Sequence, residues 1–227
     1  MRIISKALGF LTLVFLLPTV GYSQPPVGKT GFIRLADAVA TGTGQLELLV
    51  DNSSINPAGY KLGDVTGGVA LKPGSHEITI RREGNKEGKT KVSIVANETT
   101  ILIPFSEKVP ASDTEPAHWE IRVLRLKQQA PESERSATFV SVSQNPEIKV
   151  EIRDPEGKWS SVFVKRLAVA QAPILYPRGY VPIKIGETDL QPIPVSDIGN
   201  YVVLLYDTPE GEVRALNFRD QKFLSAD

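Results

Sequence analysis

The chain repeats one pattern twice, and this internal repeat limits its fold more than any other feature of the sequence. The stretch LKPGSHEITI begins at Leu71, and LYPRGYVPIKI begins at Leu175 with one inserted residue, Arg178. Four further matches keep the same order along the chain: GFIRLADA at 31 with ATFVSVSQ at 137, QLELLVDNSS at 45 with EIKVEIRDPE at 147, VSIVANETTILIPF at 92 with QPIPVSDIGNYVVLLY at 191, and IRVLRLK at 121 with VRALNFR at 213. An ordered series of this kind predicts two copies of one structural unit.

Each copy alternates apolar and polar residues with a period of two, which is typical of strands with one buried face. Clear runs are FIRLAD (32–37), EITIR (77–81), HWEIRVLRLK (118–127), EIKVEIR (147–153) and EVRALNFR (212–219). Turn sequences such as NPAG, KPGS, DPEG and TPEG separate the runs. The 17 prolines and 18 glycines interrupt any longer helical pattern. We therefore predict an all-β chain of two tandem immunoglobulin-like antiparallel β-sandwich domains.

Two details refine this prediction. The segment YVVLLY (201–206) is apolar on both faces, which predicts a central strand. In the run from Ile121 to Leu126 the apolar positions change phase midway, and the run starting at Val213 does the same. A change of phase moves the inward face by one residue, so we expect a β-bulge in both strands.

The domain boundaries follow from the repeat. We expect a signal peptide at 1–23, a first sandwich at 28–127 and a second at 137–227. Residues 128–136, QQAPESERS, are polar and charged and contain a proline, which is the composition of a short exposed linker.

The first residues have the layout of a cleavable secretory signal. Arg2 and Lys6 precede an apolar run from Ala7 to Leu17, and small residues at Gly21 and Ser23 follow. No second long apolar stretch follows that would stop transfer across a membrane. We expect an exported protein, periplasmic or secreted, with no transmembrane anchor after cleavage. Because the chain has no cysteine, neither a lipoprotein anchor nor a disulfide framework is available.

The charge balance argues against a nucleic-acid partner. Lysine plus arginine and aspartate plus glutamate both total 26, and no block of like charges occurs. Proteins that bind nucleic acids or anionic surfaces through their field carry a basic patch or stripe.

Four residues of the second unit form the predicted binding site: Trp159, Tyr176, Arg178 and Tyr180. They lie in or beside turns, where an aromatic ring can stack on a sugar while arginine pairs with an acidic group. The alternative is that the tyrosines cover the edge of the core and the tryptophan fills it. Trp119 lies in an alternating strand, and we expect it in the core.

The sequence offers no clear catalytic or metal-binding set. His76 and His118 are the two histidines, and a zinc site would have to combine them with carboxylates such as Asp113 or Glu115. We expect two solvated histidines at strand ends, and no metal or cofactor. No G-x-S-x-G sequence marks a nucleophile, and the G-x-G at Gly42 leads into a predicted strand. Two carboxylates facing each other across the cleft between the units remain an alternative, a hydrolase.

The segments FIRLADA, LELLVDN, GGVALKPGSHEITIRREG, VSIVANETTILIPF and WEIRVLRLK together resemble a bacterial envelope module, the domain of unknown function 4397. The first unit matches over most of its length, whereas the second matches through its likeness to the first. A tandem pair behind a signal peptide also resembles the AlgF family of periplasmic accessory proteins for alginate O-acetylation. That resemblance implies a role without catalytic chemistry of its own.

The expected function is therefore a non-catalytic exported binding or scaffold protein of the cell envelope. The resemblance implies an AlgF-like accessory factor for exopolysaccharide O-acetylation, whose partners are envelope proteins. The alternative is a polysaccharide-binding module that uses the aromatic residues of the second unit. An exposed sheet edge, to which a partner strand adds through main-chain hydrogen bonds, is a further route to binding.

Overall fold

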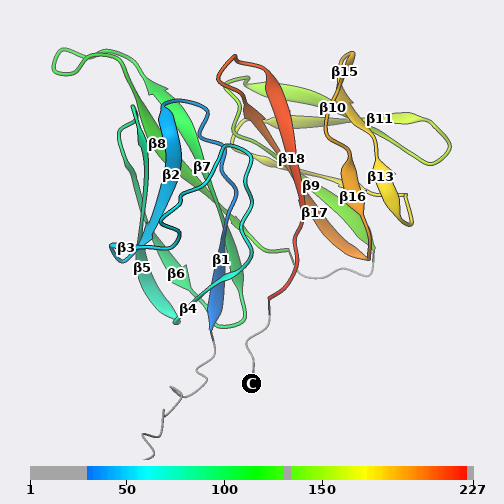
Figure 1. Ribbon diagram of the computed structural model, residues 1–227. Helices are drawn as coiled ribbons and strands as arrows, with labels where there is room; N and C mark the ends of the chain where they lie inside the picture. Colours follow the sequence, from blue (N-terminus) through cyan, green and yellow to red (C-terminus); the bar gives the residue numbers. More distant parts are fainter. Residues whose placement is uncertain (1–29, 130–133, 224–227) are drawn as a thin grey trace, which may run out of the picture.

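The computed structural model describes residues 30–129 and 134–223, so the predicted signal peptide at 1–23 lies outside the described residues. In this part of the chain all regular structure is strand, β1 to β18, and the prediction of an all-β fold is confirmed. We call β1 to β8 the N-terminal half and β9 to β18 the C-terminal half (Figure 1).

The N-terminal half is a sandwich of two four-stranded sheets. In order across the first sheet the strands are β4 (Val69–Leu71), β1 (Gly31–Leu35), β7 (Thr99–Val109) and β8 (His118–Lys127). In the second sheet they are β3 (Ser53–Ser54), β2 (Thr43–Val50), β5 (Gly74–Glu83) and β6 (Gly88–Ile94). Apolar residues of both sheets meet in one core, which we call the N-core.

The C-terminal half has the same strand order. One sheet contains β12 (Val169–Pro173), β9 (Arg135–Ser141), β17 (Gly199–Asp207) and β18 (Val213–Arg219). The other contains β11 (Trp159–Lys165), β10 (Glu147–Arg153), β14 (Ile183–Ile185) and β15 (Thr188–Asp189). Strands β13 (Gly179–Val181) and β16 (Ile193–Val195) pair with each other as a short antiparallel ribbon. The C-terminal half has its own apolar core between these two sheets, which we call the C-core. Strand β17 is central in its sheet, as the sequence YVVLLY predicts.

The prediction of antiparallel sheets is wrong for one ladder in each half. β1 runs parallel to β7, from Phe32 beside Thr99 to Leu35 beside Leu102. β9 runs parallel to β17 in the same way. Alternation with a period of two occurs in strands of both directions, so it carries no information about this ladder.

A third apolar cluster joins the two halves, and we call it the junction core. It consists of Ala36, Ala38, Ile101, Ile103, Phe105 and Leu126 from the N-terminal half and Val140, Val142, Val202, Leu204 and Phe218 from the C-terminal half. The sheets β4-β1-β7-β8 and β12-β9-β17-β18 therefore have two covered faces each, one in their own sandwich and one at the junction (Figure 1).

The junction core explains the change of phase that the sequence shows in β8. Ile121 and Val123 point into the N-core, whereas Leu124 and Leu126 point into the junction core. The ladder from β8 to β7 is continuous over all ten residues of β8, so the predicted bulge is wrong. β18 divides its apolar residues in the same way and also pairs without a shift of register.

Polar contacts border the junction core. The Arg34 guanidinium lies 4.8 Å from the ring centre of Phe218, and its Nη1 donates a hydrogen bond of 2.8 Å to the carbonyl oxygen of Arg219. Arg166 Nη2 of the C-terminal half lies 2.5 Å from Glu107 Oε2 of the N-terminal half, so an ion pair links the halves. An apolar interface with such contacts holds two units in one fixed arrangement.

Candidate functional site

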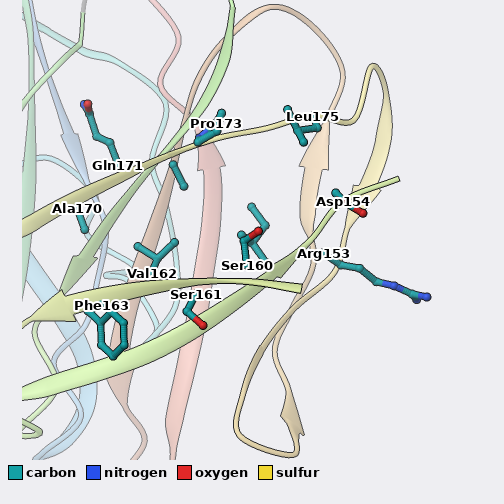
Figure 2. Close-up of a pocket in the computed structure, with 12 residues that line it drawn as sticks. Arg153, Asp154, Ser160, Ser161, Val162, Phe163, Ala170, Gln171, Pro173 and Leu175 are labelled. Carbon is teal, nitrogen blue, oxygen red and sulfur yellow. The ribbon is translucent and has the colours of Figure 1, made fainter. Parts of the chain in front are cut away.

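An open hollow of about 480 Å³ lies in the C-terminal half between the edge strands β11 and β12. Figure 2 shows Ser160 and Val162 pointing from β11 toward β12, and Ala170 pointing from β12 toward β11. Ser161 and Phe163 point to the opposite side of β11. The hollow is therefore a gap between the inner faces of the two sheets, at the side where both sheets end.

Both strands that border this hollow have an edge without a ladder partner. Among the strands that the structure describes, β11 pairs with β10 alone and β12 pairs with β9 alone. Four large apolar side chains are exposed on these strands and on the segments next to them: Phe163 (58%), Leu167 (42%), Val169 (49%) and Leu175 (63%). Unpaired N–H and C=O groups beside exposed apolar side chains form a surface to which another strand can add.

Trp159 and Tyr176, two of the predicted binding residues, are half-buried near the hairpin that joins β10 to β11. Arg153 and Lys184 lie 5.8 and 4.8 Å from the ring of Trp159, so two cations cover this ring. The Tyr176 hydroxyl donates a hydrogen bond of 3.1 Å to the carbonyl oxygen of Asp154, and its ring packs against the C-core. These contacts match the interpretation that Tyr176 covers the edge of the core.

Arg178 lies elsewhere, in a second open hollow of about 650 Å³ at one end of the C-terminal half. Arg135 and Arg219 line this hollow with it, and we call it the arginine hollow. Arg219 is paired with Asp197 at 3.1 Å, whereas Arg178 makes one hydrogen bond of 3.4 Å from Nε to the carbonyl oxygen of Ser196. Among the described residues, the Arg135 Nε is buried without a hydrogen-bond partner.

Tyr180 is exposed, with 71% of its surface accessible. It lies opposite Pro194 in the ribbon of β13 and β16. Because Val181 points into the C-core, the side chain of Tyr180 lies on the outer face of this ribbon, and Arg178 lies in the bend before β13. The structure thus places Arg178 in the arginine hollow, Tyr180 on the outer face of the β13–β16 ribbon, and Trp159 and Tyr176 near the hairpin of β10 and β11.

Sequence reasoning missed Phe163, Leu175, Arg135 and Arg219. The run of three apolar residues from Val162 to Val164 was an available signal, because one of them must leave the buried face of an edge strand. The composition of 128–136 predicts that Arg135 lies in a linker, whereas it is the first residue of β9. No local pattern marks Arg219, whose neighbours come from distant parts of the chain.

The prediction that Trp119 lies in the core is wrong. Trp119 is half-buried and lines a hollow of about 270 Å³ between the two halves. The carboxylates of this hollow, Asp207 and Glu210, both come from the C-terminal half. Asp207 accepts hydrogen bonds from the Ser143 hydroxyl at 2.6 Å and the Gln144 N–H at 2.7 Å, so its oxygens are engaged in holding the loop.

The two histidines lie apart in the N-terminal half. His76 Nε2 lies 2.8 Å from the carbonyl oxygen of Lys72, and Nδ1 lies 2.7 Å from Asp51 Oδ2. Because both partners are acceptors, these two hydrogen bonds favour the protonated ring and raise the pKa of His76. His118 Nδ1 contacts the carbonyl oxygen of Pro116 at 3.0 Å. In the described residues no group of three or more His, Asp or Glu side chains is arranged to hold a metal ion.

A buried ion pair is a further charged feature of the N-terminal half. Arg82 Nη2 donates a hydrogen bond of 2.8 Å to Asp37 Oδ2, and the Val39 N–H donates one of 2.9 Å to Asp37 Oδ1. Burial raises the pKa of the Asp37 carboxyl to about 6, although Arg82 and the Val39 N–H act in the opposite direction. This pair lies away from the hollows of the C-terminal half, so we interpret it as a structural pair.

No protein-family model matches the chain, and no curated protein is similar to it. Among solved structures, one titled "The Bacillus anthracis TIE protein" is similar over 82% of this chain, with 11% identity and a TM-score of 0.26. The chain spans 34% of the length of that protein. The resemblance to the domain of unknown function 4397 and to the AlgF family stays a prediction. The described ranges contain no helix long and apolar enough to cross a membrane.

Proposed function

We propose that this chain is a non-catalytic exported protein of the cell envelope that binds a partner protein at the open edge of its C-terminal half. One observation carries the proposal: within the described ranges β11 and β12 end their sheets without a further ladder partner, and Phe163 of β11 and Leu175, just after β12, are exposed beside the hollow. Exposed apolar side chains at an unprotected sheet edge mark an interaction site in a protein that remains monomeric and soluble. The fixed junction between the halves suits a scaffold, because it holds the site in one orientation.

The finer proposal comes from the resemblance to the AlgF family. In it the partner belongs to a complex that O-acetylates an exopolysaccharide, and this chain links components of the complex. A strain that lacks the gene would then make the same amount of polymer with fewer acetyl groups. An unchanged acetyl content in that strain would contradict this step and leave the binding proposal standing.

The binding proposal is tested by capture from the native envelope fraction with a Phe163→Glu variant. A charge at this 58% exposed position opposes apolar docking and leaves the core untouched. The matched control is Val95→Glu, at a 49% exposed position of the N-terminal half. We expect the wild type and the control to retain a protein that Phe163→Glu loses, as identified by mass spectrometry. Identical capture by all three proteins would show that the open edge is not the site.

A second candidate function is binding of an acidic polysaccharide, and the surface of Tyr180 and Arg178 favours it. Tyr180 offers an exposed ring two residues after Arg178, which lines the arginine hollow. Three arginines and one aspartate line this hollow, so its formal charge is +3 − 1 = +2. Guanidinium groups bind carboxylates through paired hydrogen bonds, and an exposed ring can stack on a sugar face.

The test of this second candidate uses polygalacturonate and its methyl ester, which have the same rings with and without charge. We expect the acid form to bind more tightly, and Arg178→Gln to weaken it roughly tenfold, because hydrogen bonds to charged groups are the stronger class. The control is Arg214→Gln, which removes one positive charge from an exposed position of the same half. Equal binding of the ester and the acid, or no binding of either, would contradict this candidate.

A further inference from the structure

The N-terminal half shows what fills the space that is open in the C-terminal half. The two halves can be superposed by register, because β1 and β9 begin matched segments and occupy the same place in their sheets. Val69 pairs with Ile33 and Leu71 pairs with Gly31. In the C-terminal half, Ala170 pairs with Phe139 and Ala172 pairs with Ala137. Ala170 and Ala172 therefore occupy the positions of Val69 and Leu71.

These positions differ in the size of the side chain. In the N-terminal half, Val69 and Leu71 pack against the N-core together with Ile55, which follows β3. In the C-terminal half the same positions carry alanines, and Figure 2 shows the methyl group of Ala170 pointing into the hollow. Two large side chains are thus replaced by two small ones, and this replacement leaves the apolar gap between β11 and β12.

The strands at this edge differ in length as well. β3 has two residues and β4 has three, whereas the matching edge strands β11 and β12 have seven and five. Short edge strands limit pairing with other chains, and long ones permit it. The C-terminal half therefore combines a long free edge with a gap in its core at the same place.

We propose that the hollow between β11 and β12 receives a large apolar side chain from an extended segment of the partner protein, which adds as a strand along this edge. The segment would supply from outside what Val69 and Leu71 supply in the N-terminal half. This inference rests on the proposed binding function and names its ligand class, an extended polypeptide with an apolar anchor. Main-chain hydrogen bonds along β11 would set its register, and the anchor in the hollow would set its specificity.

The site is suited to this ligand in size and chemistry. The volume of about 480 Å³ falls within the range of sites that bury a side chain or a small ligand. Val162 and Ile152 supply apolar walls, and Ser160 adds one hydroxyl at the rim. Burial of an aromatic or aliphatic side chain in such walls is the main source of affinity for peptides of this kind.

The test closes the hollow with the residues that the other half uses. The variant Ala170→Val combined with Ala172→Leu fills the gap from inside. The matched control is Gln171→Leu, which adds an apolar side chain to the same strand where Figure 2 shows the side chain pointing away from the hollow. Thermal unfolding of both variants verifies that they fold.

The probes are two synthetic peptides as long as β11, seven residues, one alternating threonine with phenylalanine and the other threonine with alanine, both with lysine at the ends. We expect the phenylalanine peptide to shift the amide signals of β11 and β12 and to bind at least tenfold more tightly, roughly what burial of one phenylalanine side chain supplies. In the closed variant this preference should disappear, and in Gln171→Leu it should persist. An unchanged preference in the closed variant would overturn the inference.

Other outcomes separate this inference from the proposed function. Capture of an envelope protein that depends on Phe163 but persists in the closed variant would leave the function standing and remove the apolar anchor. Loss of peptide preference in the closed variant, with no envelope protein captured, would support the hollow and remove the function. Self-association of the wild type that the closed variant lacks would assign the hollow to a second copy of the chain and overturn the inference of a partner.

Discussion

The two halves share one strand order but differ at the same sheet edge, which is closed in the N-terminal half and open in the C-terminal half. The N-terminal half ends its sheets in β3 and β4, of two and three residues, and packs Val69 and Leu71 between them. The C-terminal half ends in β11 and β12, of seven and five residues, and leaves a hollow there. This difference between a closed and an open copy is the basis of our proposal that the second copy binds a partner.

The distribution of exposed apolar side chains agrees with this difference. Within residues 30–129 and 134–223, seven large apolar residues are exposed, of which Val95 belongs to the N-terminal half and six belong to the C-terminal half. Exposed apolar residues that occur singly need no explanation, but a group of them around one edge does. The predictions below test whether the closed copy depends on its internal contacts more than the open one.

The largest effect is expected from Arg82→Ala. The Asp37 carboxylate would then stay fully buried without its partner, which costs about 3–5 kcal/mol in other buried pairs. In the C-terminal half the residue matched to Asp37 is Ser143, which carries no charge to pair. Chemical denaturation measures the loss. The control is Arg81→Ala, at a half-exposed position on the opposite face of the same strand, which should change little. Equal effects of the two variants would contradict the structural role of the pair.

The next effect concerns the junction core, on which both halves depend. Phe218→Ala removes a buried ring from the junction and should cost about 3 kcal/mol. Because Phe218 joins the halves, we expect one heat-absorption peak for the wild type and two peaks for Phe218→Ala in calorimetry. The exposed Phe163→Ala should change stability by less than about 0.5 kcal/mol and keep one peak. One peak for Phe218→Ala would show that the halves are coupled by other contacts.

A smaller effect, opposite in sign between the halves, is expected at the matched positions Leu71 and Ala172. Leu71→Ala opens the N-terminal half and should cost about 2 kcal/mol, the low end for leucine because Leu71 is only partly buried. Ala172→Leu fills the hollow and should stabilise the C-terminal half by about 0.5–1 kcal/mol. Denaturant midpoints measure both changes. A destabilised Ala172→Leu variant would show that the hollow is too narrow for a large side chain.

The sequence predicts the class of the fold and most of its strands, because alternation with a period of two follows directly from strand geometry. The sequence gives a wrong prediction where the other half of the molecule covers the second face of a strand. The change of phase from Val123 to Leu124 looks like a bulge, since one sequence cannot show that the other half covers the outer face of β8. The hollow cannot be predicted from the sequence for a related reason. Only the registers of the ladders show that Ala170 occupies the position of Val69.

The smallest effect is expected near the start of β5, just after the turn between β4 and β5, where His76 contacts Asp51. The matched residue in the C-terminal half, Val181, is buried and does not titrate. Since folding raises the pKa of His76, its stabilisation is complete below the unfolded value near 6.5 and is lost as the pH rises through the folded value. The melting temperature of the wild type should therefore exceed that of His76→Gln by about 1–2 °C near pH 5.5, and by less near pH 8.5.

The difference must also shrink at high salt, because the pair is partly exposed and its charges are screened. A difference that is independent of both pH and salt would mean that His76 acts through packing, as Val181 does, and the two turns would then be stabilised in the same way.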